Sequence, residues 1–522
     1  MSSSFVRGFG IPEHEESGED FRDEVPLTKS KKSPWTYHHV VIFFVTFSSY
    51  CLMHAIRKTF SNVKYSLVST WTSQNLSDFV YRNETWNNHH LFESDKEAEH
   101  FLGLLDALFM FSYATGLYVS GAMGDRIDPR LVLSCGIWGT AIVNFVFGYA
   151  IETYKFYSIS LYILLWIMNG LLQSCAWPAE VCIMGNWFGR GSRGLILGIW
   201  SACASVGNIV GSYLAAAVLP YGYEARKNYA FLVNSTLLFS FGFVVFFGIV
   251  SAPRELGMPD TVEHDHHNAD ASQHLLPKQP PNSRPFAISF CQAILLPGVI
   301  AYSLAYAFLK LVNYSIFFWL PYYMTNALGW KEIVADQVST WYDWGGIIGG
   351  IIGGVISDAL GRRTPVVVLQ LSLFLISLFV YTKSPNDTII NGFLMGVAGF
   401  FGNGAANLIS AACSADLGRQ EGLHGNAEAL STVTGIVDGT GSVGAALGQV
   451  VIPSLYQLIS WNAVFYMFML MIILTILCLS KLCYRETKEI YQNYKVTPYS
   501  RLPTDETIES EPNASEERSS FD

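Results

Sequence analysis

The stretch Gly121-Ala-Met-Gly-Asp125-Arg126-Ile-Asp128-Pro129-Arg130 recurs as Gly354-Val-Ile-Ser-Asp358-Ala-Leu-Gly361-Arg362-Arg363. Both copies have a glycine, three further residues, an aspartate and then a basic cluster. The copy at 121–130 follows span 2 of the apolar spans given below, and the copy at 354–363 follows span 8. Because matching motifs hold the same place in two sets of six spans, we expect a tandem duplication with a pseudo-twofold axis along the membrane normal.

Twelve apolar runs define those spans. Hydrophobic residues make up 51% and charged residues 14% of the 522 residues, whereas soluble proteins carry about 25% charged residues. A run of about 20 apolar residues crosses a hydrocarbon core of roughly 30 Å as a helix. We therefore predict an all-α polytopic membrane protein with two six-helix bundles, which excludes a secreted, fibrous or DNA-binding chain. The predicted spans are 38–60, 101–123, 131–151, 157–184, 194–219, 229–251, 294–320, 336–357, 364–382, 388–413, 427–457 and 460–483.

Three polar segments flank and divide the spans. Residues 1–34 carry seven acids and five bases, residues 252–288 carry five acids and three bases, and residues 486–522 carry nine acids and four bases. Together these segments hold nine of the ten net negative charges. The membrane body is therefore nearly neutral. The predicted domains are a disordered cytosolic N-terminus (1–34), two bundles (35–251 and 291–484), a cytosolic linker (252–290) and a disordered acidic cytosolic tail (485–522).

Orientation follows from Lys and Arg near the span ends, because these residues are enriched on the cytosolic side. Placing both termini in the cytosol puts sixteen such residues on that side and eight on the other. The same orientation places the sequons at Asn75, Asn83 and Asn386 on the lumenal or extracellular side, where N-glycosylation takes place. We therefore predict a glycoprotein with two cytosolic termini.

Cysteine and glycine patterns indicate neither a metal site nor a cofactor. The nine cysteines form no CxxC pair and lie mostly in apolar runs, where cysteine acts as a small buried side chain. The segment 439–444 fits GxGxxG, but no soluble strand precedes it, so a glycine-rich membrane helix explains it better than a dinucleotide site. We predict no cofactor, no metal and no nucleic-acid partner.

The end of the first span carries polar residues on one face. Tyr50, His54, Arg57 and Ser61 are spaced four, three and four residues apart, which places them on one side of a helix, facing the protein interior. The planar fork of Arg57 suits a phosphate, because it donates two parallel hydrogen bonds and stays charged. The alternative is that Arg57 and Lys58 extend from the helix end to the membrane surface.

The seventh span carries a second cation. Lys310 lies well inside 294–320, with Tyr306 and Tyr314 on the same face. A charge inside the hydrocarbon costs about 2.5 to 3.5 kcal/mol, so it is a candidate functional group. Because the first helices of both halves carry such a cation, we predict one central anion site. Its predicted residues are Tyr50, His54, Arg57, Lys58, Tyr306, Lys310, Asn313 and Tyr314.

Acids and glycines complete the pattern inside the spans. The acids are Asp106, Glu180, Asp343 and Asp438. They can neutralise the cations, relay protons or pair with local groups; these alternatives stay open, and we favour local pairing for most of them. Glycines spaced four residues apart in the fifth, eighth and eleventh spans predict close contacts between helices.

The repeated motif resembles the loop between the second and third helices of each half in the major facilitator superfamily, which reads Gly-x-x-x-Asp-Arg-x-Gly-Arg-Arg. The second copy has Ala359 in place of the first arginine, and the first copy has Asp128 and Pro129 in place of glycine and arginine. In that family these loops make and break charge contacts across the cytosolic gate. The resemblance implies gating roles, with ordinary cytosolic loop residues as the alternative, for Asp125, Arg126, Arg130, Asp358 and Arg362.

Longer stretches resemble the sugar-phosphate exchanger family, the eukaryotic relatives of bacterial organophosphate:phosphate antiporters. They include Arg57-Lys-Thr-Phe-Ser-Asn-Val-Lys64, Ser201-Ala-Cys-Ala-Ser-Val-Gly-Asn208, Leu309-Lys-Leu-Val-Asn-Tyr-Ser315 and Thr432-Val-Thr-Gly-Ile-Val-Asp-Gly-Thr-Gly-Ser442. The similarity covers nearly all of 37–485, and several runs are most similar to the sugar phosphate exchanger 3 branch. In bacterial relatives one arginine from each half binds the phosphoryl group. The resemblance assigns that role to Arg57, whereas the seventh helix offers Lys310, a point charge.

The resemblance implies a transporter, not an enzyme, that exchanges phosphorylated solutes for inorganic phosphate in an intracellular membrane, with the endoplasmic reticulum first and the lysosome second. Two unpaired cations in an empty site would cost roughly 5 to 7 kcal/mol, so we expect only the loaded carrier to reorient. Two alternatives stay open: a proton-coupled anion symporter or exporter that needs a partner subunit, and a non-transporting membrane receptor. The expected partners are small phosphorylated anions, phosphate and the bilayer. We expect the transport unit to be monomeric, with an accessory membrane subunit as an option.

Overall fold

The computed structural model describes residues 36–72, 90–123, 127–188, 196, 199–222, 229–258, 290–413, 417 and 430–496. In this part of the chain the regular structure is entirely helical, without a strand. The helices are α1 (Tyr37–Asn62), α2 (Lys64–Thr72), α3 (Asp95–Met123), α4 (Pro129–Phe145), η2 (Val146–Ala150), α5 (Ile151–Tyr154), α6 (Ile159–Ser174), α7 (Ala176–Trp187), α9 (Cys203–Gly222), α10 (Tyr229–Gly248), η3 (Pro253–Leu256), α12 (Phe290–Ile294), α13 (Val299–Asn326), α14 (Glu332–Leu360), α15 (Thr364–Tyr381), α16 (Thr388–Asn407), η5 (Leu408–Cys413), α18 (Leu430–Leu458) and α19 (Trp461–Val496).

Some predictions fall outside the described residues. They concern the segment 1–34, the linker from 259 to 289, the tail beyond 496, the loop residues Asp125 and Arg126, and the sequons at Asn75 and Asn83.

Each of the twelve predicted spans contains a helix. Ten helical segments within the described ranges are long and apolar enough to cross a membrane. The two remaining predicted spans correspond to α9, whose apolar stretch Cys203–Leu219 is slightly shorter, and to α14, whose glycines and aspartates lower its hydropathy. The all-α, multi-span prediction is therefore confirmed for the part of the chain that the structure describes.

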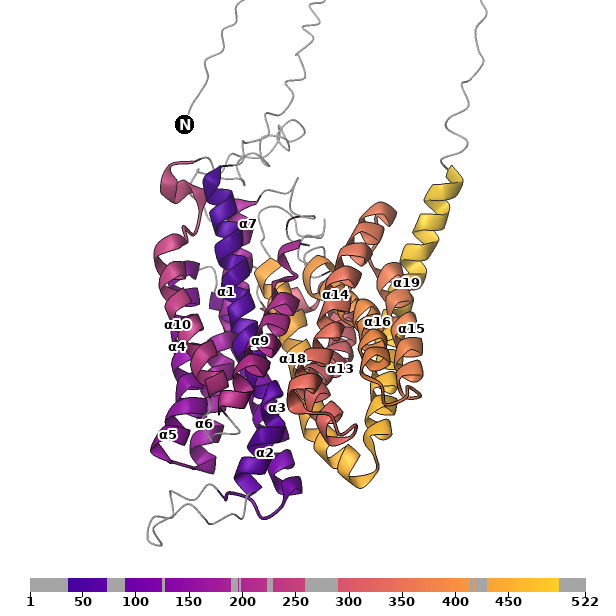
Figure 1. Ribbon diagram of the computed structural model, residues 1–522. Helices are drawn as coiled ribbons and strands as arrows, with labels where there is room; N and C mark the ends of the chain where they lie inside the picture. Colours follow the sequence, from indigo (N-terminus) through magenta and orange to yellow (C-terminus); the bar gives the residue numbers. More distant parts are fainter. Residues whose placement is uncertain are drawn as a thin grey trace, which may run out of the picture. The chain divides into compact units, whose positions relative to one another are not determined.

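The helices of the compact unit that begins at His38 form two groups, which Figure 1 shows in indigo to magenta and in orange to yellow. We call α1 to α10 the N-terminal half and α13 to α19 the C-terminal half. In the first, α3 packs against α6 and α4 against α10; in the second, α14 packs against α16 and α13 against α18. The halves meet where α3 contacts α18 and where α9 contacts α14.

Glycines allow several of these helices to touch at the backbone. A Cβ atom at Gly207 of α9 would collide with the carbonyl of Cys51 in α1. A Cβ atom at Gly345 of α14 would likewise collide with the carbonyl of Gly396 in α16. The predicted glycine rows therefore act as packing surfaces.

A short helix, α2, follows the first span after a single turn residue, Val63. Its first residue is Lys64, one of the eight cations that we assigned to the non-cytosolic side. This side chain is fully buried rather than solvated in a loop. The physical reason is the buried carboxylate of Asp106 in α3, with which Lys64 forms an ion pair.

The last helix is longer than predicted, because α19 continues to Val496. The prediction that disorder begins at 485 is therefore wrong for residues 485–496. Their polar side chains bind the first residue of α15 and the loop before it: the backbone N–H and hydroxyl of Thr364 both donate to Glu486, and Arg362 lies 2.9 Å from Glu489. These contacts stabilise a helical end that composition alone does not reveal.

Candidate functional site

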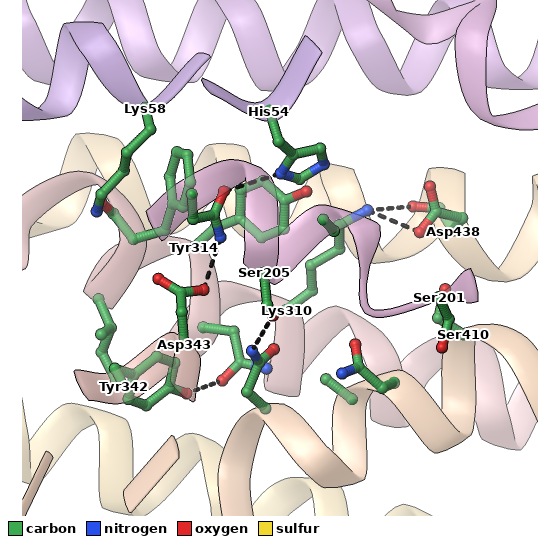
Figure 2. Close-up of a pocket in the computed structure, with 18 of the residues that line it drawn as sticks. His54, Lys58, Ser201, Ser205, Lys310, Tyr314, Tyr342, Asp343, Ser410 and Asp438 are labelled. Carbon is green, nitrogen blue, oxygen red and sulfur yellow. Dashed lines mark hydrogen bonds and ion pairs between the residues drawn. The ribbon is translucent and has the colours of Figure 1, made fainter. Parts of the chain in front are cut away.

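A cavity lies between the two halves, with about 970 Å³ of space that no atom fills, part of it continuous with solvent. Helices α1, α3, α7 and α9 line it from one half, and α13, α14, α16 and α18 from the other. Figure 2 shows the polar side chains that converge on it. Seven of the eight residues predicted for the anion site line this cavity: Tyr50, His54, Lys58, Tyr306, Lys310, Asn313 and Tyr314.

Arg57, the eighth predicted residue, lies directly behind this lining. Its side chain is only 4% exposed, which excludes an extension to the membrane surface. Nε donates to Gln173 over 2.8 Å, and Nη1 donates to the hydroxyl of Tyr314 over 3.2 Å. Among the described residues, Arg57 forms no ion pair with a carboxylate. Its charge is therefore held by neutral side chains, those of Gln173, Tyr314 and Tyr113, and its five N–H donors outnumber these partners, so donors remain for a ligand.

Lys310 approaches the same aromatic side chains from the other half. Its ammonium lies 5.7 Å from the ring of Tyr113 and 5.1 Å from the ring of Tyr314. The guanidinium of Arg57 lies 4.8 Å from the Tyr113 ring. The two cations therefore surround a shared pair of tyrosines, one cation from each half.

Lys310 also forms a local ion pair. Its ammonium lies 2.8 Å from a carboxylate oxygen of Asp438, 2.8 Å from the hydroxyl of Ser442 and 3.3 Å from the backbone carbonyl of Asp438. An ammonium has three N–H donors, so these contacts occupy all of them. A phosphoryl group can bind Lys310 only if one of these bonds is exchanged.

Lys58 is held by a backbone carbonyl. Its ammonium and the hydroxyl of Ser61 each donate to the carbonyl of Phe317 over 2.7 Å. That carbonyl is free because Pro321, four residues later in α13, has no N–H to close the helical hydrogen bond. The proline thus creates an acceptor in the C-terminal half that two donors of α1 occupy.

We expect Pro321→Ala to weaken this contact, because the new N–H competes for the Phe317 carbonyl. Loss of a hydrogen bond to a charged donor costs on the order of 1.5 kcal/mol, about tenfold in the equilibrium between closed and open arrangements. Disulfide formation between cysteines placed at positions 66 and 332 reports this closure, since Ser66 and Glu332 share a 2.5 Å hydrogen bond. The control is Pro453→Ala, because no side-chain donor among the described residues reaches the carbonyl four residues before Pro453. Unchanged cross-linking in Pro321→Ala would refute this role.

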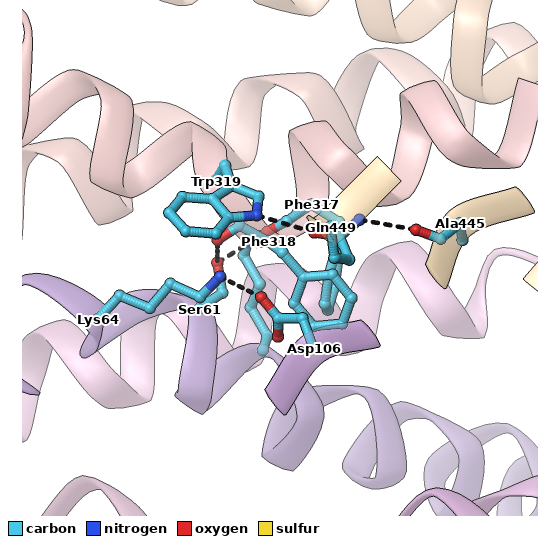
Figure 3. A network of polar contacts seen from close by, with 9 residues as sticks. Ser61, Lys64, Asp106, Phe317, Phe318, Trp319, Ala445 and Gln449 are labelled. Atoms are coloured by element: carbon cyan, nitrogen blue, oxygen red, sulfur yellow. Dashed lines mark hydrogen bonds and ion pairs between the residues drawn. The ribbon is translucent and has the colours of Figure 1, made fainter. Parts of the chain in front are cut away.

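Further polar contacts join the halves at the end of the bundle that carries α2, which we call the α2 end. Lys64 and Asp106 of the N-terminal half form their ion pair beneath Trp319, whose ring lies 3.8 Å from the ammonium (Figure 3). Glu99 of α3 accepts hydrogen bonds from Tyr322 and Gln457 of the C-terminal half. These contacts hold the two halves together at the α2 end, on one side of the cavity.

The four predicted acids have different partners. Asp106 pairs with Lys64 and Asp438 with Lys310. Asp343 accepts a hydrogen bond from Asn208. Glu180 accepts one from Ser49 over 2.5 Å, and its other oxygen is buried without a partner in the described part of the chain.

The described members of the two loop motifs contact residues of their own half. Arg130 lies 3.5 Å from Asp128, Asp358 pairs with Arg363, and Arg362 pairs with Glu489. A contact across the gate is not seen among these residues, so their gating role stays a prediction.

The remaining described sequon lies in a hydrogen-bonded turn. The amide of Asn386 donates to the carbonyl of Leu328 over 3.0 Å and accepts from the indole of Trp330 over 2.7 Å. A glycan on this nitrogen would have to displace the first bond, and glycosylation here stays a prediction.

Sequence reasoning missed three neutral residues that shape the site: Tyr113, Gln173 and Asn208. Each is a neutral residue inside an apolar span, and a neutral residue gives no insertion penalty large enough to single it out. Gln173 offered one signal, because Asn169 precedes it by one helical turn and the two side chains share a 3.0 Å hydrogen bond.

Comparisons with known proteins place this chain in a family. The sequence profile described as Major Facilitator Superfamily matches residues 42–423 and 302–498. The crystal structure of a D-xylose–proton symporter superposes with a TM-score of 0.60 at 14% identity, over 84% of this chain and 96% of that chain, and so shares its fold. A bacterial homologue of the human lysosomal transporter Spinster superposes with a TM-score of 0.57 at 11% identity, over 88% and 99%.

Several curated relatives are named as exchangers. Sugar phosphate exchanger 3 of Bos taurus is 53% identical over 88% of this chain and 96% of its own length, and that of Homo sapiens is 51% identical over 87% and 94%. Glucose-6-phosphate exchanger SLC37A2 of Xenopus laevis is 37% identical over 86% and 93%. These matches confirm a membrane transporter with two six-helix bundles. The chain belongs to the major facilitator superfamily and, within it, to the sugar phosphate exchanger family.

Proposed function

We propose that this protein exchanges a phosphorylated organic anion of the sugar phosphate class for inorganic phosphate. The observation that carries the proposal is the pair of buried cations, Arg57 and Lys310, which reach the same tyrosines from opposite halves. A guanidinium fork and an ammonium together suit a doubly charged phosphoryl group. The names of the relatives point to the same substrate class.

Transport proceeds in this proposal by rocking of the two halves around the central cavity. The α2 end is closed by Lys58, Ser61, Glu99 and Lys64, whose contacts cross from one half to the other or pack against it. Opening this end breaks those contacts. The gating residues of the loop motifs act at the opposite end.

The sequence-based explanation of obligate exchange assumed that both cations are unpaired in the empty site, and the ion pair of Lys310 changes it. Asp438 compensates Lys310, so Arg57 carries the uncompensated charge that a bound anion neutralises. An uncompensated buried charge of this kind costs about 2.5 to 3.5 kcal/mol. This cost slows the empty carrier by roughly 100-fold relative to the loaded one, so exchange is strongly favoured over net transport.

Counterflow in proteoliposomes tests the function. Glucose 6-phosphate uptake is expected to be much faster into vesicles loaded with phosphate than into vesicles without it, by roughly 100-fold from the charge cost above. Equal uptake in both would contradict exchange. Uptake driven by a pH gradient alone would favour a proton-coupled carrier, and binding without uptake would favour a receptor.

The cellular setting completes the proposal. We propose an intracellular membrane, the endoplasmic reticulum first and the lysosome second, with both termini in the cytosol and a monomeric transport unit that an accessory subunit can join. The two bundles are assigned to 35–251 and 291–484, with the linker 252–290 between them. In this orientation the α2 end faces away from the cytosol.

A further inference from the structure

His54 has one ring nitrogen with a partner and one without. Nδ1 lies 3.0 Å from the side-chain oxygen of Asn208. Nε2 has no hydrogen-bond partner among the described residues. The side chain is only 6% exposed, and the ring lines the cavity between the halves. This nitrogen is therefore available to a molecule in the cavity.

Asp343 decides which nitrogen of His54 carries the hydrogen. The amide nitrogen of Asn208 donates to Asp343 over 2.7 Å. A carboxylate only accepts hydrogen bonds, so Asn208 turns its NH₂ group to Asp343 and its carbonyl oxygen to His54. That oxygen also only accepts, so Nδ1 of His54 must donate. In the neutral ring, Nε2 is then the acceptor.

The charges around His54 favour this neutral form. Arg57 follows three residues later on the same face of α1, and Lys310 and Lys58 line the same cavity. A further positive charge on the ring would be repelled by these cations, and Asp343 is separated from the ring by Asn208. The cavity thus holds cations for the phosphoryl group and, beside them, a hydrogen-bond acceptor.

We propose that His54 is a specificity residue that accepts a hydrogen bond from a hydroxyl group of the bound anion, and that Asn208 and Asp343 are positioning residues that keep Nε2 an acceptor. This inference rests on the proposed exchange function. Both exchanged solutes supply the hydroxyl: doubly charged inorganic phosphate keeps one P–OH group, and a sugar phosphate carries hydroxyls on its organic part. A doubly ionised ester without hydroxyl groups leaves Nε2 unpaired in a buried site.

Competition during phosphate counterflow tests the inference with full-length protein in liposomes. The competitors are glycerol 3-phosphate and propyl phosphate, which have similar size and charge but differ in their hydroxyl groups. At about pH 8 both are doubly ionised, because the second phosphate pKa is about 6. An unpaired buried acceptor costs about 1 to 3 kcal/mol, so the wild type is expected to prefer glycerol 3-phosphate by about tenfold.

The variants separate the roles. His54→Phe is expected to reduce the preference to about one, and His54→Gln, which keeps an acceptor, to retain part of it. Asp343→Ala and Asn208→Ala are expected to lower the preference, whereas Asp343→Asn is expected to retain part of it, because its amide can still accept from Asn208 but can also donate and so no longer forces that orientation. The matched control is His100→Phe, because His100 is exposed on α3; it should keep the wild-type preference.

Each outcome distinguishes this inference from the proposed function. Phosphate counterflow with equal competition by the two esters, or a full preference in His54→Phe, would overturn the role of His54. A full preference in both Asp343→Ala and Asn208→Ala would overturn the positioning roles. Absence of phosphate counterflow in the wild type would overturn the proposed function and this inference together.

Discussion

Arg57→Ala is expected to abolish phosphate counterflow, with a loss of at least about 100-fold in initial rate. Arg57 has more N–H donors than its three neutral partners occupy, and no carboxylate among the described residues compensates its charge. Hydrogen bonds to a charged group are worth about 1.5 to 3 kcal/mol each, and the fork supplies two of them. Arg57→Lys keeps the charge but loses the fork, so we expect a loss of roughly 10- to 100-fold.

Counterflow rates normalised to reconstituted protein measure this effect, with the elution profile of each variant as a check of folding. Arg254→Lys is the matched control, because Arg254 is an exposed residue of η3, outside the cavity. Near-normal exchange by Arg57→Ala would remove Arg57 from the binding site.

The second large effect concerns the ion pair between Lys310 and Asp438. Lys310→Ala leaves the Asp438 carboxylate buried, unpaired and beside the cavity, where it repels an incoming anion. Removing one partner of a buried pair destabilises a protein by about 3 to 5 kcal/mol because the other charge is left uncompensated. If the same repulsion acts on the bound anion, exchange should fall by at least roughly 100-fold. The double variant Lys310→Ala/Asp438→Ala removes the repulsion as well, and we expect it to exchange about tenfold faster than Lys310→Ala.

A double-mutant cycle on the apparent KM for phosphate measures this coupling, with thermal unfolding recorded for every variant. Coupled losses indicate that the pair acts as one unit at the site. Independent losses that multiply would show that Asp438 does not compensate Lys310 during transport.

Much of the fold could be predicted from the sequence, because hydrocarbon imposes a simple rule: every span must be a long apolar helix. The repeated loop motif added the division into two halves. Contacts between distant residues could not be predicted. Lys64 is buried because it pairs with Asp106 of another helix. Residues 485–496 are helical because Glu486 and Glu489 bind Thr364 at the start of α15 and Arg362 in the loop before it.

The residues of the site that could be predicted are those that carry a charge inside a span. Arg57 and Lys310 stand out because a cation inside a span is costly. Lys58 shows the limit of this reasoning: its partner is a backbone carbonyl that Pro321 leaves free, and nothing in the sequence near Lys58 indicates it. Asn208 is neutral, so its link between His54 and Asp343 emerges only when α1, α9 and α14 are placed together.

The most direct test of the central claim is an experimental structure of the full-length protein with phosphate bound. We predict one phosphoryl group within hydrogen-bond distance of both Arg57 and Lys310, with Lys310 having given up one of its bonds to Asp438 or Ser442. A phosphate that contacts only one half, or that binds while all the bonds of Lys310 stay in place, would contradict the account.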